Sequence, residues 1–276
     1  GSSISELGEL QHLHGTLSIL NLQNVGCSGD ALKADLKGKK KLQGLVLSWG
    51  DEIEDYSKDM FVVPLFMERE AEVPKGFPRV TAVGSEFYGN GSSMKSFDSL
   101  EILRFENMPE WKKWLCLGDE NGTFCSLQEL YIIDCPKLKG DLPKTLPLLR
   151  KFRIENCETL GSALSRAPDM HELKLVNCDK MQLQALPTEL QNLAVENCSV
   201  QDSSLELMLQ HCTRLEGLSI GSCASLKSLP EGRLPVSLKR LMINNCAMEV
   251  RAKIGFELVK EKKSRVELHV IHFTGD

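Results

Sequence analysis

The residues best suited to chemistry in this 276-residue sequence are ten cysteines and six histidines. Six of the cysteines follow short apolar stretches at one fixed offset: Cys135, Cys157, Cys178, Cys198, Cys223 and Cys246. Such thiols could pair as disulfides, bind a metal or act as nucleophiles. A metal site is disfavoured, because no CxxC or second histidine pair stands at zinc spacing, and His211 with Cys212 reads as a helix end. We expect no metal and no cofactor.

Other motifs of enzyme chemistry are also missing from the sequence. It contains no phosphate-binding glycine-rich loop with its Lys and Ser or Thr, no HExxH and no GxSxG. The net charge of -5 argues against a general nucleic-acid binder, and no apolar run approaches the roughly 18 residues that span a bilayer. The sequence predicts a binding protein and not an enzyme.

Repeats are the elements that must position the cysteines. Each of the six ends a frame such as LQELYIIDC or LLRKFRIENC, with apolar residues at the first, fourth and sixth places. The frames begin at Leu42, Leu100, Leu127, Leu149, Met170, Leu190, Leu215 and Leu238. From Leu100 onward, successive starts lie 20 to 27 residues apart, which is typical of leucine-rich repeats. The predicted fold is an α/β leucine-rich-repeat solenoid, a horseshoe with a parallel β-sheet on its concave face and short 3₁₀, helical or irregular segments on its convex face.

In this fold the six cysteines form a structural ladder at the inner corner where the chain leaves each strand. There a thiol acts as a small buried hydrophobe with a weak donor, which favours free thiols over disulfides. Sequons at Asn90, Asn121 and Asn197 point mildly the other way. A glycan on Asn197, inside a repeat frame, would obstruct stacking.

The chain is read as a single domain, residues 1–276. It comprises N-terminal repeats (1–50), an irregular or shortened region (51–99), regular repeats (100–246) and a C-terminal cap with a helix and a last strand (247–276). Helices are expected over 28–41, with the basic run 37–41 as its solvated end, and over 203–212. Trp111 and Trp114 are expected to pack on the convex flank, with an exposed partner-binding patch as the alternative.

Outward side chains of the strands come from the fifth and seventh places of each frame. Those in the N-terminal half mix charge with aromatic and arginine residues, types that are enriched in binding hot spots. The predicted partner-binding residues are Arg104, Glu106, Tyr131, Ile133, Arg153, Glu155, Lys174 and Glu196. An alternative reading is that the alternating Arg and Glu residues only form cross-strand ion pairs.

Several longer strings resemble the leucine-rich-repeat region of plant intracellular immune receptors, the coiled-coil nucleotide-binding class of disease-resistance proteins. They include LGELQHLHGTLSILNLQNV, VGSEFYGNGSS and CPKLKGDLPK, and the likeness covers roughly residues 7–250. Between residues 51 and 79 the chain departs from the regular repeats of that family. The chain is shortened or divergent there, which leaves the continuity of the inner sheet open.

The resemblance implies a cytoplasmic or nuclear sensor module that recognises a pathogen effector or a modified host protein. It also implies docking on the nucleotide-binding switch domain of the same receptor, with no nucleic-acid or membrane partner. Three alternatives remain open at this point: a substrate-receptor subunit of a ubiquitin ligase, a truncated paralogue without signalling activity, and an extracellular receptor domain, which would require paired capping cysteines and occupied sequons.

Overall fold

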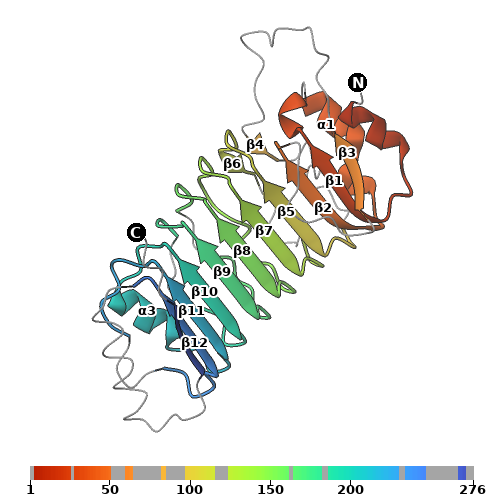
Figure 1. The fold of residues 1–276 in the computed structure, drawn as a ribbon. Helices are drawn as coiled ribbons and strands as arrows, with labels where there is room; N and C mark the ends of the chain where they lie inside the picture. The colour runs from red at the N-terminus through yellow and green to blue at the C-terminus, as the bar shows by residue number, and fades with distance from the viewer. Residues whose placement is uncertain are drawn as a thin grey trace.

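A parallel β-sheet of eleven strands runs the length of the molecule (Figure 1). The computed structural model describes residues 3–25, 28–50, 60–64, 82–84, 97–115, 124–161, 164–181, 186–229, 234–246 and 267–271. The strands of this sheet are β1 (Gly15–Leu20), β2 (Leu42–Ser48), β3 (Met60–Pro64), β5 (Ile102–Glu106), β7 (Glu129–Ile133), β8 (Lys151–Glu155), β9 (Glu172–Val176), β10 (Asn192–Glu196), β11 (Gly217–Gly221), β12 (Arg240–Asn244) and β13 (Glu267–Ile271). The predicted leucine-rich-repeat solenoid is confirmed.

The sheet is continuous across the irregular region, because β2 pairs directly with β5. Its strand order is β13-β12-β11-β10-β9-β8-β7-β5-β2-β1-β3. Strand β3 follows β2 in the chain but pairs with the far side of β1, so it forms the N-terminal edge of the sheet. The sequence left open whether the inner sheet continues past residues 51–79, and the structure shows that it does. Residues 51–59 and 65–79 themselves lie outside the described residues.

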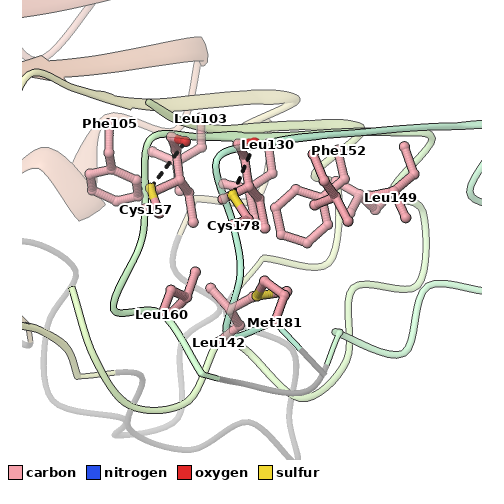
Figure 2. Packing of buried hydrophobic residues seen from close by; sticks show 14 of the residues in the cluster. Leu103, Phe105, Leu130, Leu142, Leu149, Phe152, Cys157, Leu160, Cys178 and Met181 are labelled. Carbon is pink, nitrogen blue, oxygen red and sulfur yellow. Dashed lines mark hydrogen bonds between the residues drawn. The ribbon is translucent and has the colours of Figure 1, made fainter. Parts of the chain in front are cut away.

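The inward side chains of successive strands form the hydrophobic core. Strands β5 to β12 pair in register without a shift, so the fourth and sixth places of each frame stack on their counterparts. Leu130, Phe152 and Leu173, at the fourth place of consecutive units, are fully buried. Figure 2 shows such leucine and phenylalanine side chains packed together beside Cys157 and Cys178. Burial of a large apolar side chain is worth roughly 1.5–3 kcal/mol, so each unit is stabilised mainly by its neighbours.

The two α-helices among the described residues are short, with seven and eight residues. The predicted helix over 203–212 is confirmed as α3 (Asp202–Leu209). The helix predicted over 28–41 is confirmed for its first half only. It ends early as α1 (Ser28–Ala34), because Asp35 adopts a left-handed conformation before the 3₁₀ turn η3 (Leu36–Gly38).

The expectation for the basic run 37–41 is partly right: Lys37, Lys40 and Lys41 are exposed, but the run lies beyond the end of α1 and Lys39 is buried. Its Nζ donates to the backbone oxygens of Leu7, at 2.5 Å, and Leu10, at 3.1 Å. These oxygens lie at the end of the 3₁₀ helix η1 (Ile4–Glu9), which packs against α1. A buried cation is tolerated there because two backbone carbonyl oxygens accept its hydrogen bonds; that of Leu7 also accepts from the Leu10 amide.

Trp111 and Trp114 are both buried, which agrees with the expectation that they pack and disagrees with the exposed patch. Their rings contact the ring of Phe105, an inward residue of β5, at centroid distances of 4.5 and 4.9 Å. Trp114 also belongs to β6 (Lys113–Trp114), which pairs with β4 (Ala82–Val83) in a separate two-stranded sheet. The aromatic cluster fills the space that the longer unit after β5 leaves under the main sheet.

The expected last strand is confirmed as β13, which pairs in parallel with β12. The helix expected before it lies outside the described residues. Strand β13 covers the C-terminal edge of β12, whose inward residues would otherwise lack a neighbour on one side.

Candidate partner-binding face

The face of the sheet that points away from the core is called the open face below. Three outward residues of each strand lie on it and form three rows across the sheet, because the strands pair in register. The frame places used in the sequence analysis gave only two of these rows. The third row, at the third place of each frame, contains Glu129, Lys151, Glu172, Asn192, Gly217 and Arg240. A strict application of the two-residue period to all five strand residues would have found it.

Arg104, Glu106 and Tyr131 form a compact cluster on β5 and β7. The Nε of Arg104 donates to Oε1 of Glu106 at 2.7 Å, and its guanidinium carbon lies 4.6 Å from the centre of the Tyr131 ring. The Tyr131 hydroxyl donates to Oε2 of Glu129 at 2.5 Å. Burial, reinforced by this hydrogen bond and the charge of Glu129, raises the pKa of Tyr131 well above its usual value. The phenol therefore stays protonated and acts as a donor.

Part of the predicted partner-binding set is covered within the molecule itself. Glu106, Tyr131 and Ile133 are 4%, 7% and 8% exposed, although all three occupy outward positions. Towards the N-terminus, the outward residues Ser18, Val46 and Ser48 are also buried. The open face is therefore more accessible from β8 towards the C-terminus than on the strands before β8. The residue types had favoured the N-terminal half for partner binding.

Glu155 is clamped by two cations on β8 and β9. Arg153 donates from Nε and Nη2 to its two carboxylate oxygens, at 2.7 and 2.8 Å, and the Nζ of Lys174 lies 2.9 Å from Oε1. Burial alone would raise the pKa of Glu155, but the hydrogen bonds from the two cations outweigh it and hold the pKa below its usual value. The alternative reading is thus partly right: Lys174 pairs across strands, whereas the Arg–Glu pairs lie within single strands.

Small side chains dominate the open face on β10 and β11. Ala194 and Ser219 occupy the middle row, and Gly217 and Gly221 occupy the outer rows of β11. Above Gly217, the Nη2 of Arg240 donates to Oδ1 of Asn192 at 3.1 Å, which joins β12 to β10. A Cβ on Gly217 would lie 2.6 Å from that Asn192 oxygen, so this bridge requires glycine beneath it.

The structure places the six ladder cysteines in one buried row at the ends of their strands. Each thiol donates to the carbonyl oxygen two residues earlier, at 3.0 to 3.3 Å. Cys157 and Cys178 also approach the carbonyl oxygens of Ile132 and Ile154 on the preceding strand, drawn as dashed lines in Figure 2. Burial raises the pKa of Cys178 to about 12 and that of Cys223 to about 11. Such thiols are poor nucleophiles.

A second ladder, of asparagine and related residues, precedes the cysteines and was missed in the sequence. Asp134, Asn156, Asn177 and Asn197 all have positive φ, between 48° and 56°. The amide of Asn156 donates to the Asp134 carboxylate at 2.5 Å, Asn177 donates to Asn156, and Asn197 donates to Asn177. The sequence feature that could have predicted this ladder is the Asn or Asp directly before most ladder cysteines. These two residue types tolerate left-handed backbone better than most others. Because the Asn197 amide is used in this ladder, a glycan there would break it.

Covalent and metal links are not found within the described ranges. The eight cysteines located there are all free thiols. In the same ranges no three His, Cys, Asp or Glu side chains are grouped so that they could hold a metal ion. Nor does any helix among the described residues combine the length and the apolar character needed to cross a membrane.

The fold and the open face define a leucine-rich-repeat protein. A family model described as R13L1/DRL21 LRRs matches residues 4–67. RPP13-like protein 1 of Arabidopsis thaliana is 29% identical over 316 residues, which cover 89% of this chain and 28% of that protein. Disease resistance protein RGA2 of Solanum bulbocastanum is 27% identical over 253 residues, which cover 83% of this chain and 25% of that protein. The resemblance to the leucine-rich-repeat region of plant nucleotide-binding disease-resistance proteins is thereby confirmed.

The chain spans only about a quarter of the length of these two relatives. One solved structure is also similar, the leucine-rich repeat domain of the type III effector XCV3220 (XopL). Its TM-score is 0.40 at 16% identity, and the match covers 62% of this chain and 68% of that one.

Proposed function

We propose that the chain is a non-enzymatic protein-recognition module, the sensor and autoinhibitory leucine-rich-repeat region of a plant immune receptor. The observation that carries this proposal is the open face itself. It is a continuous parallel sheet whose outward rows hold charged and aromatic side chains, fixed by their neighbours, while the stacked leucines of the core lie on the other side. Pre-ordered side chains on a rigid sheet lose little entropy when a partner binds.

The partners we propose are a pathogen effector or a modified host protein, and the nucleotide-binding switch domain of the same receptor. The resemblance to disease-resistance proteins supports both. A ligand can release the switch domain only if it binds the released state more tightly than the docked state. One surface that serves both partners would provide this difference, because they would compete for it.

Of the predicted partner-binding residues, Arg153, Lys174 and Glu196 are the best placed for contact. The side chains of Arg153 and Lys174 are 32% and 35% exposed, and Glu196 is exposed. Arg104 is less suitable, because its side chain is 15% exposed and neutralises the buried Glu106. Reversing the charge of Arg104 would leave a buried carboxylate unpaired, so a loss of binding could reflect misfolding.

The test is co-purification of the chain with a nucleotide-binding domain from a coiled-coil-class resistance protein and with candidate effectors. The face variant carries Glu172→Lys, Glu196→Lys and Arg240→Glu, all on the open face. The control variant makes the same net change of charge on exposed connections, with Asp141→Lys, Glu158→Lys and Lys180→Glu. We expect the face variant to lose its partners and the control variant to keep them. A folded face variant that binds like the unmodified chain would refute the proposal.

A further inference from the structure

We propose that the open face on β10 and β11 holds an arginine or lysine side chain of a protein partner against Glu196. The inference rests on the function proposed above and names the chemistry of one contact within it. It follows from a comparison of two acidic residues in the same outward row, Glu155 and Glu196.

The environment of Glu155 shows how this sheet satisfies a carboxylate on its open face. One cation, Arg153, comes from the same strand two residues earlier, and a second, Lys174, comes from the middle row of the next strand. With both in place, the Glu155 side chain is only 12% exposed. The nearby Glu106 follows the same rule, with Arg104 two residues before it on β5.

Around Glu196 the two corresponding positions hold small residues instead. Strand register aligns Arg153 with Lys174, Lys174 with Ala194, and Ala194 with Ser219. Relative to Glu196, Ala194 therefore stands where Arg153 stands relative to Glu155. Ser219 stands where Lys174 does. Among the described residues, no lysine or arginine pairs with the Glu196 carboxylate, and the residue is exposed.

A further small residue, Gly221, aligns with Glu196 on the next strand. A Cβ on Gly221 would lie 3.3 Å from Cγ of Glu196 and 3.7 Å from Cβ of Asn244. Both side chains thus flank Gly221, which is buried, and Ser219 is the next outward residue of β11. At the other end of β11 the Asn192–Arg240 bridge closes the face over Gly217. Between the two buried glycines, Ser219 is the half-buried residue of β11 that remains accessible on the open face.

An arginine or lysine side chain matches this site in charge and in shape. A carboxylate only accepts hydrogen bonds, so its partner must donate, and a guanidinium can donate two in parallel, as Arg153 does to Glu155. The apolar stem of the incoming side chain would lie beside the half-buried Met242, which aligns with Ser219 in register. When the partner covers the site, the ion pair is screened from water and becomes stronger than an exposed pair.

The experiment uses a phage library of random dodecapeptides, selected on the whole chain and counter-selected on the Ala194→Arg variant. In that variant the new arginine should pair with Glu196 as Arg153 pairs with Glu155, which fills the site from within. We expect the selected peptides to share an arginine or lysine. Their affinity should fall at least tenfold with Glu196→Gln and with Ala194→Arg, and should weaken as salt concentration rises. Glu158→Gln, an exposed carboxylate away from the open face, should change nothing.

Selected peptides without a cationic residue, or with equal affinity for the unmodified chain and Glu196→Gln, would overturn the inference. Circular dichroism must first show that both variants are folded. Peptides that depend on Lys174 or Arg240 but not on Glu196 would refute the proposed contact with Glu196. They would still support the open face as a recognition surface. Peptides with no dependence on any open-face residue would count against both proposals.

Discussion

Asn177 tests how much the asparagine ladder contributes to the stability of the solenoid. Its side chain donates to Asn156 and accepts from Asn197, and its φ is 53°. Asn177→Ala removes both hydrogen bonds, each worth about 0.5–1.5 kcal/mol net. It also places an alanine in left-handed backbone, at a cost of roughly 1–2 kcal/mol. The free energy of unfolding should therefore fall by about 2–5 kcal/mol.

Asn177→Gly separates these two causes, because glycine adopts positive φ without steric cost. It loses the same hydrogen bonds and gains freedom in the unfolded chain, worth about 0.5–1 kcal/mol. Since that gain is smaller than the cost of left-handed alanine, Asn177→Gly should be about 1 kcal/mol more stable than Asn177→Ala. Urea unfolding followed by circular dichroism measures both values.

Asn245 provides a matched comparison at the end of the ladder. It has a φ of 46°, similar to that of Asn177, but its amide makes one long hydrogen bond of 3.4 Å, to the hydroxyl of Ser222. Asn245→Ala should therefore cost less than Asn177→Ala, by roughly the value of one hydrogen bond, about 1 kcal/mol. If all three variants unfold within a few tenths of a kcal/mol of the unmodified chain, the ladder has no stabilising role and the reasoning fails.

Three further outcomes can be measured. Because the pKa of Cys178 is raised, the unfolded chain loses this thiol proton first, and the free energy of unfolding should fall as pH rises from about 9 towards 12. The six buried ladder thiols should also react slowly with a thiol reagent at pH 8 in the native chain, and fast labelling of them would contradict this. Arg153→Met should raise the pKa of Glu155, which NMR titration of its carboxyl carbon can detect. An unchanged pKa would mean that the Arg153–Glu155 ion pair does not persist in solution. Lys39→Met should remove the lysine donor from the Leu10 carbonyl oxygen and one of two donors from that of Leu7, which also accepts from the Leu10 amide. The loss should cost about 1–3 kcal/mol and speed amide hydrogen exchange in η1. Unchanged exchange would show that the lysine is not needed there.

Much of the fold could be predicted because a repeat specifies its own structure locally. The alternation of apolar and polar residues within each frame fixes which side chains face the core, and repetition fixes the register between neighbouring strands. For this reason Leu130, Phe152 and the ladder cysteines lie where the frame predicted. Trp111 is also buried as expected, and a large aromatic side chain gains much by burial.

The candidate site was less predictable, because exposure depends on neighbours that the frame does not name. Tyr131 and Ile133 were correctly placed on the outward side of β7, yet they are covered. The row that contains Lys151 and Arg240 was missed because only two places of each frame were followed. The contrast between Glu155 and Glu196 requires the register of four strands, β8 to β11, which no single frame contains.

By itself the sequence determined the repeat, the inward and outward sides of its strands and the class of protein it resembles, since these depend on residues close together in the chain. Tertiary structure alone decided that β3 turns back to the far side of β1 and that Lys39 is buried against η1. Both contacts join segments about 30 or more residues apart. Such pairings depend on the loop-closure entropy and on the competing partners that each segment could find, and no local pattern encodes either.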